Sequence, residues 1–177
     1  MSAEMEVRGI FFQVLKQVFP HISEIVGEDL AKYFQDIDGE AWYDAAPYLA
    51  AVKYLRDRIS PQVMVLIGNQ LVETIREQVR DSDVTSPREL AEKLPELYGN
   101  FVRGKGAGDW HVEEFAPGRA IIEETGVTGN VDFSVGVIKS SFEAVGAYNV
   151  RVAVIDDRTK GADANRYLAE WMEPDAG

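Results

Sequence analysis

Residues 109–171 read DWHVEEFAPGRAIIEETGVTGNVDFSVGVIKSSFEAVGAYNVRVAVIDDRTKGADANRYLAEW, and the patterns in this stretch indicate the architecture of the chain. Apolar residues that alternate or run together predict strands over Trp110–Phe115, Arg119–Glu124, Asn149–Ile155 and Asn165–Trp171. Between the second and third strands, apolar residues at helical spacing predict a helix over Val131–Val145. We therefore expect a four-stranded antiparallel sheet with the chain order β-β-α-β-β.

The residues that precede this unit predict helices. Apolar residues recur at helical spacing over residues 7–19, 22–34, 48–59, 61–75 and 90–101. Ser60-Pro61 and Ser86-Pro87 are typical helix starts, and Glu89 completes a capping-box pattern with Ser86. We expect a single α+β domain over residues 1–177, in which a helical part (1–103) packs on the β-β-α-β-β part (109–172).

The charge of the chain argues against polyanionic partners. The 177 residues include 18 Lys and Arg against 30 Asp and Glu, which gives a net charge of -12. Such an acidic surface repels nucleic acid and anionic lipid. Hydrophobic residues make up 46% of the sequence, which is ordinary for a soluble globular protein.

The sequence has no cysteine, and this removes disulfides, thiol catalysis and cysteine-ligated metals. The first residues lack a positive segment followed by an apolar run, so they do not predict a signal peptide. No apolar stretch approaches the roughly 20 residues that span a bilayer. We expect a cytoplasmic protein that uses neither a membrane nor nucleic acid as a partner.

Two stretches together resemble a known superfamily. The first is Gly39-Glu40-Ala41-Trp42-Tyr43-Asp44, followed by Tyr48-Leu49 and Ile67-Gly68; the second is Gly118-Arg119-Ala120-Ile121-Ile122-Glu123, followed by the helix with Gly136-Val137-Ile138 and two closing strands. In order and spacing the chain resembles the superfamily of haem-nitric-oxide-binding (H-NOX) domains, four-vinyl-reductase-like domains and TRAPP-type subunits. The resemblance implies helices on an antiparallel sheet, a buried pocket between them, and dimerisation through N-terminal helices.

The sequence also departs from these relatives. H-NOX domains hold the haem propionates with a Tyr-x-Ser-x-Arg signature, which is missing here, and the loop at residues 156–163 lacks the cysteines of the vinyl-reductase-like branch. The resemblance therefore implies the scaffold and an apolar pocket, and we favour no cofactor.

Aromatic residues are the best candidates for a binding site, because pockets for apolar ligands are lined by such side chains and a few polar groups. Arg119 is included because a guanidinium can hold a ligand carboxylate in a bidentate fashion. The predicted ligand-binding residues are Trp42, Tyr48, Trp110, Phe115, Arg119, Phe133, Phe142 and Tyr167. The alternative is that the aromatic side chains simply fill the core, or that Trp42 lies at a partner surface.

The chain contains two histidines, His21 and His111, which are weak candidates for axial haem ligands. Neither has the spacing of a metal-binding pair, and surface positions are the simpler interpretation. In the pairs Glu113-Glu114 and Glu123-Glu124, strand alternation turns one carboxylate of each pair inward. Two inward carboxylates on paired strands are able to do acid–base work, although solvated strand edges explain the pairs more simply. We assign no catalytic residue and expect no enzyme.

From these observations we predict a non-catalytic sensory or ligand-binding domain for a small apolar or amphipathic molecule. The signal would pass through a homodimer or a signalling protein partner, with an interface on the apolar stripe of the first helix: Ile10, Phe11, Val14, Leu15 and Val18. One alternative is a structural or adaptor subunit with a filled core. Another is a haem-based gas sensor.

Overall fold

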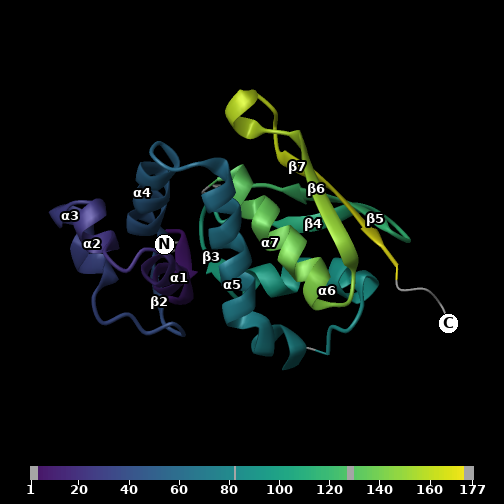
Figure 1. Cartoon of the computed structure of the whole chain (residues 1–177), viewed down its shortest axis with the longest axis horizontal. Helices are drawn as coiled ribbons and strands as arrows, with labels where there is room; N and C mark the ends of the chain where they lie inside the picture. Colours follow the sequence, from purple (N-terminus) through teal and green to yellow (C-terminus); the bar gives the residue numbers. More distant parts are fainter. Residues whose placement is uncertain (1–3, 82, 127–129, 174–177) are drawn as a thin grey trace.

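A computed structural model describes residues 4–81, 83–126 and 130–173 (Figure 1). The first part of the chain comprises β1 (Glu6–Arg8), α1 (Ile10–Val18), α2 (Ile22–Ile25), α3 (Glu28–Ala31), the 3-10 helix η1 (Lys32–Phe34), β2 (Trp42–Asp44), α4 (Ala45–Arg56), α5 (Pro61–Asp81), α6 (Pro87–Gly99) and β3 (Val102–Arg103). The second part comprises β4 (Trp110–Ala116), β5 (Arg119–Glu124), α7 (Val131–Ala144), β6 (Tyr148–Asp156), the 3-10 helix η2 (Arg158–Lys160) and β7 (Asn165–Met172).

The second part contains the predicted sheet. Its four strands are antiparallel neighbours in the order β4-β5-β7-β6, and α7 lies between β5 and β6 in the chain. The register places Ile122 of β5 beside Tyr167 of β7, and Val154 of β6 pairs with the same tyrosine from the other side. The α+β class and the chain order β-β-α-β-β are therefore as the sequence predicts.

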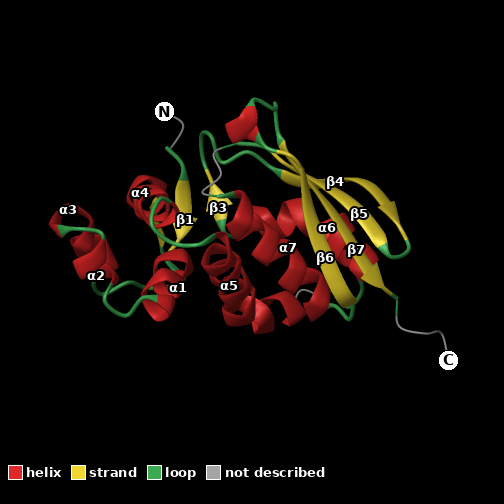
Figure 2. Ribbon diagram, turned by 45° about the horizontal axis from the view of Figure 1, so that its top comes forward, coloured by secondary structure: helices red, strands yellow, loops and turns green. Residues whose placement is uncertain are grey.

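Helix α7 covers one face of this sheet (Figure 2). The helix begins at an Asn130 cap, whose side-chain oxygen accepts hydrogen bonds from the backbone N–H groups of Asp132 and Phe133. Ile138 and Phe142 of α7 pack against inward-facing side chains of β5 and β7 in one hydrophobic cluster. The side chains of β5 and β7 alternate between the two faces of the sheet, so every second side chain points toward α7.

Helix α5 packs on α7 through two glycines. A Cβ at Gly68 would lie 2.1 Å from the carbonyl oxygen of Phe133, and a Cβ at Gly136 would lie 2.1 Å from that of Val65. Nearby, the buried hydroxyl of Ser140 donates to Oδ1 of Asn69 at 3.0 Å. The two helix backbones therefore touch, and this accounts for the mid-helix glycine in α5 despite its cost of about 1 kcal/mol relative to alanine.

A second, smaller sheet was not predicted. Strands β1, β2 and β3 are two or three residues long and pair in the order β2-β1-β3. Val7 belongs to β1 and is buried, whereas its spacing had placed it on the first helix; that helix begins at Ile10. The predicted second helix is likewise divided into α2, α3 and η1, with a break at Gly27, whose φ is 85°.

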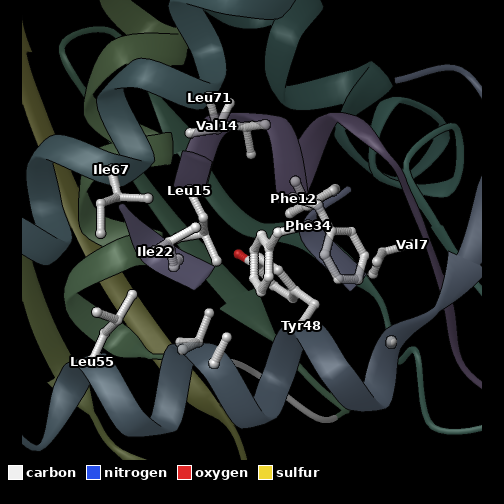
Figure 3. Packing of buried hydrophobic residues seen from close by; sticks show 14 of the residues in the cluster. Val7, Phe12, Val14, Leu15, Ile22, Phe34, Tyr48, Leu55, Ile67 and Leu71 are labelled. Atoms are coloured by element: carbon white, nitrogen blue, oxygen red, sulfur yellow. The ribbon is translucent and has the colours of Figure 1, made fainter. Parts of the chain in front are cut away.

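The apolar stripe of α1 faces the core of the same chain. Phe11, Val14 and Leu15 are buried, while Ile10 and Val18 are partly buried against the same cluster. Figure 3 shows this packing: Phe12 of α1 lies near Phe34 and Tyr48, with ring centroids 5.5 and 5.7 Å away. These side chains already pack against α4 and α5 of the same chain. The stripe is therefore not free to form the dimer interface that the sequence predicts, which corrects that expectation.

Two hydrophobic clusters make up the core. One joins α1, α4 and α5, and the other joins α6, α7 and the four-stranded sheet. Tyr98 and Val137 pack against both clusters. In the part of the chain that the structure describes, no helix is both long and apolar enough to cross a membrane.

We propose that the helical part and the sheet part unfold as one unit, because the backbone contact between α5 and α7 joins them. The expected result is one thermal transition, at the same temperature by calorimetry, far-UV circular dichroism and tryptophan fluorescence. Two separated transitions would contradict the single-domain prediction.

Candidate ligand-binding site

A largely apolar cavity lies where the two clusters meet. Its volume is about 130 Å³. The side chains that line it come from both clusters and from the segments that join them: Met5, Val7, Phe11, Tyr48, Leu49, Leu71, Val72, Ile75, Leu90, Leu94, Leu97, Tyr98, Phe101, Val102, Trp110, Glu124, Phe133, Ser134, Val137 and Ser141. A dry cavity of roughly 150 Å³ in another protein holds one benzene molecule, so this one suits a ligand of that size.

Aromatic rings form much of the wall. Tyr98 of α6 stacks on Trp110 of β4, with ring centroids 5.7 Å apart and planes inclined by 12°. Phe11 meets Tyr48 edge-on at 5.3 Å and lies 6.4 Å from Phe133. The hydroxyl of Tyr98 donates to the carbonyl of Ala107 at 2.7 Å, which fixes the ring against the sheet. The wall is thus built by helices from both parts of the chain.

Glu124 places a carboxylate in this wall. Its exposed fraction is 4%, because strand alternation turns it toward α7 while the neighbouring Glu123 faces outward beside His111. Four neutral groups donate to it: Nε1 of Trp110 at 3.0 Å, Oγ of Ser134 at 3.1 Å, Nδ2 of Asn165 at 3.2 Å and the hydroxyl of Tyr167 at 2.5 Å. A carboxylate offers about four lone-pair directions, so these donors satisfy it fully.

Burial raises the pKa of Glu124, and the hydrogen bonds from Tyr167, Asn165, Ser134 and Trp110 oppose that rise. Burial also raises the pKa of Tyr167, and the adjacent Glu124 raises it further. Tyr167 therefore stays protonated and keeps donating to the carboxylate.

This raised pKa predicts a pH dependence of stability. An acid whose pKa is higher in the folded state contributes stability that is complete below its unfolded pKa and is lost as the pH rises through the folded value. Relative to Glu124→Gln, the native protein should therefore lose free energy of unfolding as the pH rises from about 4.5. Urea unfolding of both proteins across a pH series measures the difference. A native protein that gained free energy of unfolding relative to Glu124→Gln as the pH rose would contradict the raised pKa.

Three predicted ligand-binding residues line the cavity: Tyr48, Trp110 and Phe133. Tyr167 lies behind the wall, where its ring packs 6.5 Å from Trp110.

The other four predicted residues lie elsewhere. Trp42 sits under the guanidinium groups of Arg8 and Arg103, at 4.4 and 4.1 Å from the ring centroid. Phe115 and Phe142 both pack on Trp171, and Arg119 is exposed at the turn between β4 and β5.

Sequence reasoning missed Tyr98, the leucines of α6 and the role of Glu124. The apolar spacing of α6 predicted a helix with one buried face, but the sequence does not indicate which other elements that face packs against. For Glu124 the available signal was strand alternation, which indicated one inward carboxylate in the Glu123-Glu124 pair.

A second depression, of about 490 Å³, is lined by apolar side chains such as Ile59 and Met64 and by charged side chains of both signs. Its lining includes Arg56, Asp132, Asp157 and Lys160, and Lys160 pairs with Asp157 at 3.1 Å. Arg56 pairs with Asp57 at 3.3 Å, so both described basic side chains of this depression already have acidic partners. We therefore place the candidate site in the smaller, apolar cavity.

Comparisons with known proteins identify the fold. No family model matches the sequence, and no curated protein is similar to it. Among solved structures, an H-NOX protein from S. oneidensis in the Fe(II)NO state superposes with a TM-score of 0.70 at 13% identity, over 94% of this chain and 99% of that chain. Unliganded Fe(II) H-NOX from K. algicida gives 0.70 at 12% identity, over 96% and 99%. An oxygen-binding H-NOX domain related to soluble guanylate cyclases gives 0.64 at 12% identity, over 94% and 93%. The chain therefore has an H-NOX-like fold.

The cavity residues do not fit haem. Axial haem ligands are His, Cys, Met or Tyr side chains. His21 is exposed near Glu24, and His111 lies near Asp109 and Glu123 on the sheet, so neither lines the cavity.

The remaining candidate axial ligands in the wall are Met5, Tyr48 and Tyr98. Methionine binds haem iron in cytochromes c together with a histidine, and the described lining contains no histidine. Burial raises the pKa of Tyr48 and of Tyr98, which disfavours the phenolate that would bind iron. Among the described lining residues there is also no Arg or Lys to hold propionates. No cluster of His, Asp and Glu that would hold a metal ion occurs among the side chains that the structure describes.

Proposed function

We propose that this chain is a non-catalytic ligand-binding domain that holds one small apolar or amphipathic molecule in the cavity between α5, α6, α7 and the sheet. One observation carries the proposal: the cavity combines a continuous apolar wall with a single buried, fully hydrogen-bonded carboxylate. Pockets for small molecules have this composition, with many apolar side chains and few polar groups that orient the ligand. The H-NOX-like fold is consistent with a sensor, because similar folds carry bound gases in the solved structures.

A ligand in this position would act on the packing of the two clusters. Leu94, Leu97 and Tyr98 bring α6 to the cavity, while Leu71 and Ile75 bring α5. The backbone contact between α5 and α7 leaves little freedom there, so α6 is the wall that adjusts to an occupant. A ligand shifts such an equilibrium by its difference in affinity for the two arrangements. We propose that a protein partner or a second copy of the chain in the cytoplasm reads this change.

The test is native mass spectrometry of the purified protein, followed by thermal-shift titration with toluene, phenol and indole. The expected result is extra mass on the native chain or a rise in melting temperature that saturates with ligand. Haemin added to the protein should give no ligated Soret band; a band that disappears on His111→Ala would favour the haem sensor. No bound mass and no shift with any compound would favour the adaptor subunit with a filled core.

Filling the cavity should abolish ligand binding. In Ser141→Phe the new ring would occupy the space next to Val137, and we expect at least a tenfold loss of affinity for the ligands that bind the native protein. Ala144→Leu, on the same helix but away from the lining, is the control and should bind as the native protein does. Equal binding by Ser141→Phe would place the ligand elsewhere.

A further inference from the structure

The carboxyl group of Glu124 has no basic partner in the described part of the cavity. Glu124 is the lone acidic residue among the described residues of the lining, and that lining has no Lys, Arg or His. Its four hydrogen-bond donors, Trp110, Ser134, Asn165 and Tyr167, are all neutral. Hydrogen bonds satisfy the lone pairs of this carboxyl group but supply no countercharge, so burial raises its pKa. A cation beside Glu124 would favour the ionised form, because buried charges in proteins are normally paired.

The aromatic wall next to Glu124 suits a cation. Trp110 donates to the carboxylate and also stacks on Tyr98, so two ring systems lie beside the acidic group. Phe11, Tyr48 and Phe133 add further rings from α1, α4 and α7. Aromatic faces attract cations electrostatically, and the attraction is largest where water is excluded.

Ser134 offers a way for a ligand to reach the carboxylate. Its hydroxyl lies 3.1 and 3.2 Å from the two oxygens of Glu124 and 3.4 Å from the carbonyl oxygen of Asn130. A hydroxyl has one proton and rotates freely. If the hydroxyl of Ser134 turned toward Asn130, the lone pairs of Glu124 that it now occupies would become available. Because Ser134 lines the cavity, a ligand there could take its place as donor.

We propose that the ligand of this cavity is an organic ammonium ion, with an aromatic or aliphatic body of about the size of a benzene ring and its charged nitrogen beside Glu124. The proposal rests on the proposed function of the cavity and names the chemical class of its occupant. The net charge of -12 on the chain adds a long-range attraction for such a cation.

The experiment compares three compounds with the same ring: benzylamine as its ammonium ion, benzyl alcohol and toluene. Binding to the full chain at pH 7 is measured by isothermal titration. The expected result is at least tenfold tighter binding of the ammonium ion than of either neutral compound. Toluene or benzyl alcohol binding as tightly as the ammonium ion would overturn this inference and leave the proposed function intact. No binding by any of the three would overturn both.

Variants locate the effect. In Glu124→Gln the preference for the ammonium ion should disappear while toluene still binds; Glu123→Gln, which changes the adjacent outward carboxylate, should retain the preference. If Glu124→Gln does not fold by near-UV circular dichroism, Tyr98→Leu replaces it. Loss of that ring should weaken the ammonium ion more than toluene, and equal weakening of both would overturn the proposal.

Discussion

Glu124→Leu should lower the free energy of unfolding by about 4 kcal/mol. Leucine fills most of the space of the glutamate but accepts no hydrogen bond, so Trp110, Ser134, Asn165 and Tyr167 lose their common acceptor. A buried donor without a partner costs about 1–3 kcal/mol, and rotation of the two hydroxyls offsets part of the total. In a chain of this length the melting temperature should fall by roughly 8–16 °C.

The adjacent residue supplies the control. Glu123 faces outward, where its carboxylate lies 3.7 Å from Nε2 of the half-exposed His111. Partly exposed pairs near the surface contribute about 0–1 kcal/mol, so Glu123→Leu should change stability by no more than that. Chemical denaturation of both variants measures the two values. Similar losses at positions 123 and 124 would show that the carboxylate network does not hold the sheet to α7.

Gly68→Ala should lower the free energy of unfolding by about 3 kcal/mol. The new methyl group would lie 2.1 Å from the carbonyl oxygen of Phe133 and 2.9 Å from the backbone nitrogen of Val137. Neither neighbour is a flexible side-chain end, so α5 and α7 must move apart, and overpacking of this kind costs about 1–3 kcal/mol or more. Gly136→Ala, which would meet the carbonyl of Val65, should have a similar effect.

Gly99→Ala is the matched control for these glycines. Gly99 is the last residue of α6, and a Cβ there meets no atom within 4 Å. Alanine favours the helix by up to about 1 kcal/mol over glycine, so this variant should be neutral or slightly more stable. Thermal unfolding of the three alanine variants in one buffer provides the comparison. If Gly68→Ala were as stable as Gly99→Ala, the close approach of α5 and α7 would be wrong.

The sequence predicts the main sheet well because its strands are long enough to carry a pattern. The expected strand over Asn149–Ile155 extends by one residue at each end in the structure, and Arg119–Glu124 is the same in both. The small sheet escaped prediction for the opposite reason: two or three residues, such as Val102–Arg103, display no period. Val7 shows the resulting error, since one apolar residue fits a helical stripe and a short strand equally well.

The sequence indicated the type of candidate site, an apolar pocket, but not which residues line it. Aromatic enrichment indicated an apolar pocket, yet Phe142 and Tyr48 look alike in the sequence, and only tertiary packing sends one to Trp171 and the other to the cavity. Strand alternation indicated an inward carboxylate in the Glu123-Glu124 pair. The hydrogen-bond network around Glu124, however, depends on donors that lie up to 43 residues away in the sequence. Such distant partners leave no local signal.

The contact between Gly68 and Gly136 also bears on how the chain matures during synthesis. Translation proceeds at about 5–20 residues per second, so α7 leaves the ribosome several seconds after α5. Until then, the surface of α5 around Gly68 has no partner, and Phe133 and Val137 are missing from the core of the helical part. The nascent chain therefore carries an uncovered apolar surface from the synthesis of α5 until that of α7, which makes it a natural client for chaperones that bind such surfaces.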